Sequence, residues 1–202
     1  MSDNLILIFT RNPELGKVKT RLAATIGNIY ALEVYEFLLN HTNNIVKNID
    51  VDKRVLYSDT INYDDIWSNT IYQKQEQFGL DLGARMKNAF ASALADGYKK
   101  VIIIGSDLYD LEASDIELAF EKLTTYDAVV GPADDGGYYL LGLKFIPDNI
   151  FINKKWGSKT VLRDTLYDLV RYSIGILTSK NDIDTYKDMK KIPAFKKYIT
   201  QK

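Results

Sequence analysis

The segment from Val101 to Asp107 constrains the fold more than any other part of this sequence. Its residues are Val-Ile-Ile-Ile-Gly-Ser-Asp: four apolar β-branched side chains, two small residues and a carboxylate. A short, continuous apolar run is typical of a strand that is buried on both faces, as in a parallel sheet covered by helices. We therefore expect a central strand at Val101–Gly105, with Asp107 just beyond its carboxyl end.

Shorter apolar runs alternate with segments of helical period along the rest of the chain. Further strands are expected at Leu5–Thr10, Arg54–Ser58, Ala128–Gly131, Tyr138–Leu143 and Tyr172–Leu177. Between them, Ser114 and Glu117 have the spacing of a capping box that opens a helix. The alternation predicts an α/β fold, a three-layer α/β/α sandwich with a mostly parallel mixed sheet. No linker or repeat interrupts it, so one domain over residues 1–202 is expected.

Composition excludes several classes of function. The chain has no cysteine, one histidine and a net charge of −1. Thiolate nucleophiles, cysteine zinc sites and multi-histidine metal sites are therefore excluded, and no global positive field would recruit nucleic acid. No apolar run is long enough for a membrane span, so we expect a cytoplasmic protein with a small-molecule substrate. The sequence leaves the oligomeric state open.

A basic loop follows the first predicted strand. Four cationic side chains occur within eleven residues: Arg11, Lys17, Lys19 and Arg21. Gly16 lies among them and permits a backbone approach to a ligand, so the loop has the groups that bind a phosphate chain. It is not a Walker A loop, because the first glycine of that pattern is missing. A solvated basic loop with no ligand is the alternative.

Aspartates follow two of the predicted strands. Asp107 comes after the central strand, and Asp182 and Asp184 come after the last one. Because ligands bind outside the carboxyl ends of parallel strands, these carboxylates are candidate ligands for Mg²⁺ or Mn²⁺ bridging to a phosphate. Each has a simpler alternative: Asp107 could cap a turn, and Asp184 could cap the helix expected from Thr185.

The segment between the hairpin strands is richer in aspartate and glycine than a tight turn requires. It consists of Asp134, Asp135, Gly136 and Gly137, followed by Tyr138. We interpret it as an acceptor loop, with Asp135 placed to orient or deprotonate a hydroxyl. A plain surface hairpin is the alternative.

Three further residues are candidates for nucleotide binding. Asp81 and Gly83 open the helix before the central strand, where Asp81 could also be the N-cap. Lys159 precedes another helix and could reach a phosphate. Trp156, three residues earlier, is either core or a stacking surface.

Five stretches in this order resemble the bacterial glycosyltransferase-like family of the nucleotide-diphospho-sugar transferase superfamily, which has the GT-A fold. They are Pro13…Gly16-Lys17-Val18-Lys19-Thr20-Arg21-Leu22, Asp81-Leu82-Gly83…Arg85-Met86, Gly105-Ser106-Asp107, Gly131-Pro132…Asp135-Gly136-Gly137-Tyr138-Tyr139 and Asp182-Ile183-Asp184-Thr185. The superfamily includes the phospholactate and molybdenum-cofactor guanylyltransferases, whose basic loop is similar.

The resemblance implies a Rossmann-like sheet, one divalent metal and specific roles for four residues. Asp107 and Asp184 would be the metal ligands, and Lys19 with Arg21 would contact the phosphates. The chain departs from the pattern at Tyr109, where many members have proline.

Three functions remain open at the level of sequence. The first is glycosyl transfer from a nucleotide sugar, with Asp107, Lys19 and Asp135 as the catalytic groups. The second is nucleotidyl transfer with release of pyrophosphate, which would use the same cations. The third is a nucleotide-binding domain without turnover, whose binding would survive loss of Asp107.

Overall fold

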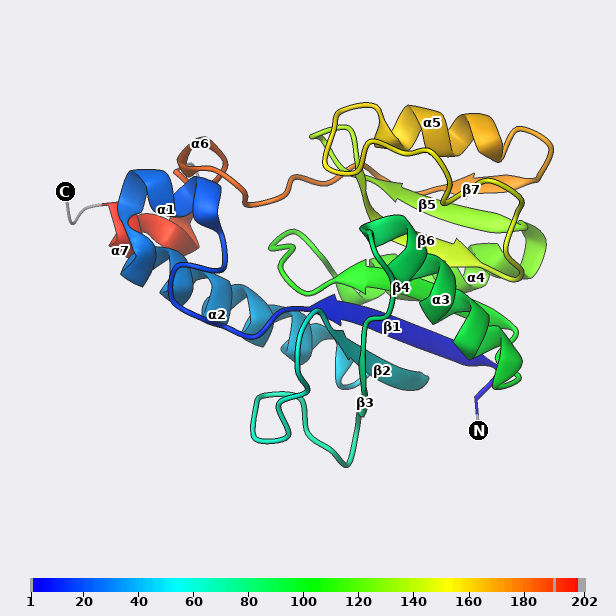
Figure 1. Cartoon of the computed structure of the whole chain (residues 1–202), viewed down its shortest axis with the longest axis horizontal. Helices are drawn as coiled ribbons and strands as arrows, with labels where there is room; N and C mark the ends of the chain where they lie inside the picture. Colours follow the sequence, from blue (N-terminus) through cyan, green and yellow to red (C-terminus); the bar gives the residue numbers. More distant parts are fainter. Residues whose placement is uncertain (1, 191, 200–202) are drawn as a thin grey trace.

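The computed structural model describes residues 2–190 and 192–199, and its centre is one mixed sheet. The strands of the described chain are β1 (Asn4–Thr10), β2 (Asp52–Tyr57), β3 (Gln73–Glu76), β4 (Lys100–Gly105), β5 (Ala128–Pro132), β6 (Tyr138–Leu143) and β7 (Ile174–Ile176). They lie in the order β3-β2-β1-β4-β6-β5-β7, and only β6 is antiparallel to its neighbours (Figure 1). The predicted mostly parallel mixed sheet is confirmed.

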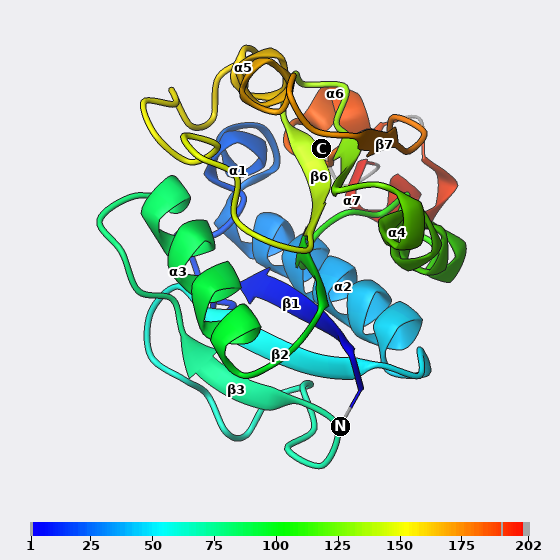
Figure 2. The same cartoon turned by 90° about the vertical axis from the view of Figure 1, so that its right-hand side faces the viewer.

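Helices cover both faces of the sheet because the side chains of its strands alternate in direction. The helices are α1 (Thr20–Ile26), α2 (Asn28–Val46), α3 (Leu82–Ala95), α4 (Ala113–Thr125), α5 (Val161–Asp168), α6 (Tyr186–Met189) and α7 (Lys196–Ile199), with a 3₁₀ turn, η1 (Pro193–Phe195). Ile6 and Ile8 of β1 belong to the core beneath α2 and α4, whereas Leu5 and Leu7 belong to the core beneath α3 and α5. Figure 2 shows α3 and α2 on opposite sides of β1. The result is the predicted three-layer sandwich.

A third, smaller core joins the C-terminal segment to the first two helices. Leu22 of α1 and Leu38 of α2 are fully buried against Ile183, Met189 and Phe195. Figure 1 shows α6 and α7 beside α1, although they lie at opposite ends of the chain. This packing brings the residues that precede α6 close to those that precede α1.

Two details differ from the sequence-based expectation, and a third agrees with it. The strand β3 was not predicted, because it is a polar edge strand, Gln-Lys-Gln-Glu, without an apolar pattern. The predicted capping box at Ser114 was wrong: α4 begins at Ala113, and its capping box joins Glu112 to Asp115. The hairpin between β5 and β6 was correct, with a register shift at Gly131 and Pro132.

The strand order positions the site. β1 pairs in parallel with β2 on one side and with β4 on the other, and Phe9 lies opposite Gly105. The chain therefore leaves β1 and β4 at the same edge, at the point where the order reverses. Ligands of open α/β sheets bind at such a switch point. No helix in the described part of the chain is long and apolar enough to cross a membrane.

Candidate functional site

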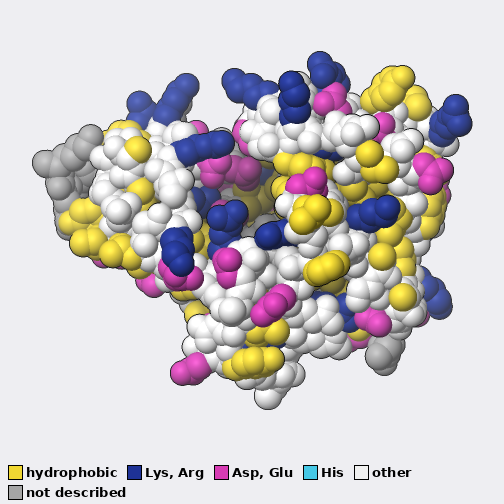
Figure 3. All heavy atoms as spheres, in the orientation of Figure 1, with side chains coloured by type: hydrophobic (Ala, Val, Ile, Leu, Met, Phe, Trp, Pro, Cys, Tyr) yellow, Lys and Arg dark blue, Asp and Glu magenta, His cyan; other side chains and the backbone are white. Residues whose placement is uncertain are grey.

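A polar cleft of about 560 Å³ lies at this switch point. Its walls come from the end of β1 and the basic loop, the end of β2, the segment that leads into α3, the end of β4, and Asp184. Figure 3 shows it as a hollow with both cationic and acidic side chains around its mouth. All four predicted cations, Arg11, Lys17, Lys19 and Arg21, line it, and so do Asp107 and Asp184.

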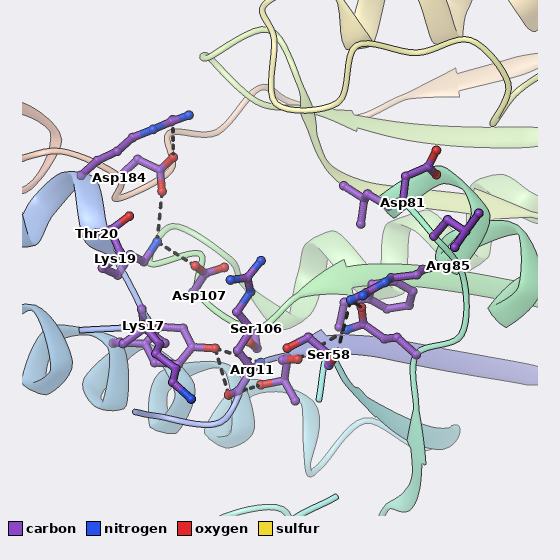
Figure 4. Close-up of a pocket in the computed structure, with 18 residues that line it drawn as sticks. Arg11, Lys17, Lys19, Thr20, Ser58, Asp81, Arg85, Ser106, Asp107 and Asp184 are labelled. Atoms are coloured by element: carbon purple, nitrogen blue, oxygen red, sulfur yellow. Dashed lines mark hydrogen bonds and ion pairs between the residues drawn. The ribbon is translucent and has the colours of Figure 1, made fainter. Parts of the chain in front are cut away.

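Lys19 is the centre of an ionic cluster in this cleft. Its Nζ lies 2.7 Å from Oδ2 of Asp107 and 3.3 Å from Oδ1 of Asp184 (Figure 4), and only 5% of its side chain is exposed. Burial lowers the pKa of this ammonium, but the two carboxylates outweigh it and hold the pKa well above its ordinary value. Lys19 is therefore a permanent cation. The Nη1 of Arg21 lies 3.3 Å from the other oxygen of Asp184.

The backbone at Lys19 is unusual. Lys19 has φ 45° and ψ 42°, in the left-handed region, and it stands immediately before α1. Val18 beside it is buried in the core beneath α2, which holds the loop to the domain. Left-handed non-glycine residues cost free energy and concentrate at functional sites. This conformation carries the side chain of Lys19 inward, toward Asp107.

The first residue of the basic loop is held by a tyrosine that the sequence did not single out. The backbone N–H of Arg11 donates to Oη of Tyr35, 3.1 Å away, and this hydroxyl donates to the carbonyl oxygen of Arg11 at 3.2 Å. Burial raises the pKa of the Tyr35 hydroxyl, which stays a neutral donor. Lys17 pairs with Glu14 at 2.6 Å on the exposed side of the loop. Gly16 does not line the cleft. Its φ of 78° is in the left-handed region, so glycine is favoured here because of the conformation of the turn.

The far wall contains a fifth cation, Arg85, which was quoted only as part of the family pattern. Its Nε donates to the carbonyl oxygen of Gly79 at 3.2 Å, and its Nη1 lies 3.4 Å from Oε1 of Gln77. Figure 4 shows Arg85 facing the basic loop across the cleft. Its position in the first turn of α3 was the signal that could have identified it. Asp81 lines the same wall and caps α3 by accepting from the N–H of Ala84 at 2.8 Å, as predicted.

A second cavity, of about 240 Å³, adjoins the cleft and shares Phe9 and Leu82 with it. Asp135, Gly137, Tyr138 and Asp182 line this smaller pocket. Burial, followed by the negative charges of Asp107, Asp135 and Asp184, raises the pKa of Asp182 to about 7. Four carboxylates therefore gather where the two cavities meet, and Lys19 only partly offsets them.

The two aspartates of the acceptor loop have different surroundings. Asp135 faces the smaller pocket, and its Oδ1 accepts from the N–H of Gly137 at 2.8 Å. Asp134 is not part of the pocket, because its carboxylate accepts from the hydroxyl of Ser179. Gly136 is required by packing: it has φ 92°, and a Cβ there would lie 2.4 Å from the carbonyl oxygen of Lys159.

Three residues predicted to bind nucleotide line neither cavity: Gly16, described above, Gly83 and Lys159. Gly83 packs beneath Trp156, where a Cβ would meet the indole at 2.6 Å, so it serves the contact between helix and loop. Lys159 is exposed, and its backbone packs against Gly136. The helix after Asp184 is capped by Thr185 with Asp188, so Asp184 is not its N-cap.

The donor set suits a divalent cation that is completed by a substrate. In residues 2–190 and 192–199, no three acidic or histidine side chains form a complete ligand set. Mg²⁺ is commonly held by one or two carboxylates, with water and phosphate oxygens as its other ligands. Asp107, Asp182 and Asp184 offer carboxylate oxygens, and burial, followed by the neighbouring carboxylates, raises the pKa of Asp182.

A family model matches residues 42–158, more than half of the chain; its description is "Uncharacterized protein conserved in bacteria (DUF2064)". The chain belongs to the DUF2064 family. Asp81, Asp107 and Asp135 lie inside the matched region, whereas Lys19, Asp182 and Asp184 lie outside it. No curated protein matches the sequence.

Among solved structures, the chain is 36% identical to a "putative nucleotide-diphospho-sugar transferase" from Desulfovibrio desulfuricans G20. The TM-score is 0.83, and the match covers 92% of this chain and 84% of the other. This DUF2064 protein thus belongs to the nucleotide-diphospho-sugar transferase superfamily, which confirms the predicted resemblance and the transferase class.

Two more distant structures share the fold alone. A cytidylyltransferase from Leptospira borgpetersenii is 13% identical, with a TM-score of 0.56 over 93% of this chain and 84% of its own. The 4-diphosphocytidyl-2C-methyl-D-erythritol synthase from Anaerococcus prevotii is 11% identical, with a TM-score of 0.59 over 96% and 98%.

Proposed function

We propose that this DUF2064 protein is a metal-dependent glycosyltransferase that uses a nucleotide sugar, and that residues 1–202 act as one domain. The observation that carries the proposal is the juxtaposition of Lys19 with Asp107 and Asp184 inside a cleft lined by four more cations. The 36% identical relative, described as a nucleotide-diphospho-sugar transferase, supports the same class of donor.

The large cleft suits the diphosphate of such a donor. Arg11, Lys17 and Arg21 line one side of it and Arg85 the other, so phosphate oxygens between them would meet cations from both directions. Guanidinium groups bind phosphate through two parallel hydrogen bonds, which fixes its orientation as well as neutralising it. Gln77 and Ser58 line the same wall as Arg85 and would contact the nucleoside end.

A divalent cation, Mg²⁺ or Mn²⁺, would be held by Asp107 with Asp184 or Asp182. When bound, it would stabilise the negative charge of the departing diphosphate. Lys19 already lies between Asp107 and Asp184, so its ammonium orients both carboxylates and adds positive charge beside the leaving group. The site therefore places permanent charge where the reaction develops negative charge.

Transfer would take place where the two cavities meet. The acceptor hydroxyl oxygen forms a bond to the anomeric carbon, and the bond from that carbon to the diphosphate oxygen breaks. The electron pair leaves with the nucleoside diphosphate, and the hydroxyl proton passes to a carboxylate. Asp135, which lines the smaller pocket, is the candidate to accept it.

Nucleotidyl transfer is the second candidate, and the number of cations favours it. Five lysine and arginine side chains line the large cleft, enough to bind a triphosphate. In that reaction an acceptor oxygen attacks the α-phosphorus and pyrophosphate leaves. The two distant structures described as cytidylyltransferase and synthase show that the fold accommodates such proteins, and no more.

Product analysis separates these functions. The protein is incubated with Mg²⁺ and a panel of nucleotide sugars and nucleoside triphosphates, and the products are resolved by anion-exchange chromatography. A nucleoside diphosphate released from a nucleotide sugar supports the proposal, whereas pyrophosphate released from a triphosphate supports nucleotidyl transfer. Binding without either product, unchanged in Asp107→Ala, would support a domain without turnover.

A further inference from the structure

The smaller pocket differs from the large cleft in the chemistry of its wall. It is lined by aromatic and aliphatic side chains, including Phe9, Met86, Tyr138, Trp156 and Val161. Tyr138 donates to Sδ of Met86 at 3.7 Å, and Trp156 packs its indole over Gly83. These contacts give the pocket a fixed apolar wall that reaches the edge of the phosphate cleft at Phe9 and Leu82.

The pocket is lined by acidic side chains and by no basic side chain of the described residues. Asp135 and Asp182 line it, and no lysine or arginine in the described ranges 2–190 and 192–199 does. Lys19 lies beyond the boundary, where Asp107 and Asp184 already engage its ammonium. Lys159 follows Ser158 of the pocket wall, but its side chain is exposed and lines neither cavity.

We propose that the smaller pocket is an acceptor site for a compound with an apolar body and no anionic group, which excludes phosphorylated and carboxylated acceptors. The inference rests on the proposed function for the donor, and adds the class of acceptor. An apolar body would fill the wall around Trp156, and the acceptor hydroxyl would face Asp135. A phosphate there would be desolvated beside Asp135 and Asp182, with no lysine or arginine among the described residues of the wall to pair with it.

This assignment also bears on the two candidate reactions. Nucleotidyl transfer to a phosphate acceptor requires cationic groups around the attacking oxygen, and they would have to line this pocket. The pocket has none among the described residues, whereas the cleft for the donor has five. A neutral hydroxyl needs only a base and a shaped wall, and the pocket supplies both.

Three matched probes test the proposal without any turnover: benzyl alcohol, benzylamine and benzyl phosphate. They share one aromatic body and differ only in carrying a hydroxyl, an ammonium or a phosphate group. The protein is labelled with 5-fluorotryptophan and titrated with each probe, and the two ¹⁹F resonances are followed. Trp156 lines the pocket, while Trp67 is 2% exposed, lies outside it and is the internal reference. Trp67→Phe assigns the signals.

Saturable shifts of the Trp156 resonance with benzyl alcohol or benzylamine are expected, at affinities at least tenfold higher than that of benzyl phosphate. Equal or tighter binding of benzyl phosphate at Trp156 overturns the proposal, and so does the absence of a response to all three probes. Because no nucleotide is present, either outcome is independent of whether the donor assignment is correct.

A pair of variants that each add one positive charge provides a second test. Ser158→Arg places a guanidinium on the pocket wall, and benzyl phosphate is then expected to bind at least tenfold better than to the unmodified protein. Thr125→Arg adds the same charge at the exposed end of α4, outside both cavities, and should change nothing. If both variants improve benzyl phosphate binding equally, the selectivity does not come from the pocket and the proposal fails.

Discussion

The ammonium group of Lys19 donates a hydrogen bond to Asp184, 165 positions further along the chain, over 3.3 Å. The same nitrogen lies 2.7 Å from Asp107, so one buried lysine joins the start of α1, the end of β4 and the segment before α6. The small core around Leu22, Ile183 and Phe195 holds these segments together. The positions of Lys19 and Asp184 in the proposed site therefore depend on this small core, which packs α1 and α2 against the C-terminal segment.

Lys19→Met is expected to abolish activity and to lower stability. It keeps the length and apolar stem of the side chain but leaves Asp107 and Asp184 without their shared cation. An ion pair broken from one side costs about 3–5 kcal/mol when both charges are buried. Asp107 and Asp184 are 39% and 43% exposed, so a smaller loss of about 1–2 kcal/mol is expected. Chemical denaturation and turnover measure the two effects. Lys17→Met, at an exposed residue of the same loop, should leave stability nearly unchanged, and equal destabilisation by both would contradict the role given to Lys19.

Asp107→Asn is expected to remove the metal-dependent part of nucleotide binding and at least about 3–4 kcal/mol of transition-state stabilisation. The substitution keeps the size of the side chain and removes the charge that faces Lys19 and the cation. Thermal-shift titration with nucleotide, with and without Mg²⁺, together with turnover, measures this. Asp110→Asn, an exposed neighbour outside the cleft, is the control. Turnover near that of the unmodified protein would refute the metal assignment.

Asp182→Asn is expected to stabilise the protein at pH 8 in the absence of divalent cations. Folding raises the pKa of Asp182 from its ordinary value near 3.8 to about 7. A raised carboxyl pKa means that the folded state disfavours the charge, so stability is lost as the pH rises from about 4 to about 7. Removing the charge should add about 1–2 kcal/mol at pH 8 and less at pH 5.

Urea denaturation at the two pH values measures this effect. Asp64→Asn, an exposed carboxylate between β2 and β3, should show no such difference between pH 5 and pH 8. A loss of stability at pH 8 on substituting Asp182 would mean that its carboxylate is not destabilising, contrary to the charge balance of the cluster.

Gly136→Ala is expected to destabilise the fold by about 3 kcal/mol or more, because a steric overlap is added to the strain of a left-handed backbone. Gly136 has φ 92°, and its Cβ would lie 2.4 Å from the carbonyl oxygen of Lys159. Gly97→Ala is a matched control, because Gly97 has φ 96° with nothing within 4 Å of its Cβ. It should therefore show only the backbone strain, about 1–2 kcal/mol. Equal losses of unfolding free energy would show that the contact with Lys159 is not limiting.

Much of the site could be predicted from the ends of strands. The apolar run Val101–Gly105 predicts a buried strand, and the rule that parallel strands present their carboxyl ends at one edge places Asp107 beside the basic loop. Asp81 as a helix cap and the β5–β6 hairpin follow from local chemistry in the same way. In each case the information lies within a few residues, where turn and capping preferences operate.

Local sequence patterns could not predict the role of a residue when that role depends on segments far away in the chain. Gly83 and Lys159 have the residue types of a nucleotide site, but Trp156 covers the first and the second lies outside both cavities. The edge strand β3 has no apolar period, so nothing in its four residues indicates a strand. The backbone of Lys19 is left-handed, although lysine, unlike glycine or asparagine, rarely adopts that conformation.

By itself, then, the sequence determined the layered α/β fold, the transferase superfamily and the residue types at the sheet edge. These follow from periodicity, strand-end chemistry and motif order. Only the tertiary structure decided that Lys19 lies between Asp107 and Asp184 and that Arg85 completes the cationic wall. It also decided that no lysine or arginine of the described residues lines the second cavity. Each of these findings depends on how close segments far apart in the chain lie to one another. The packing of the three cores determines those distances.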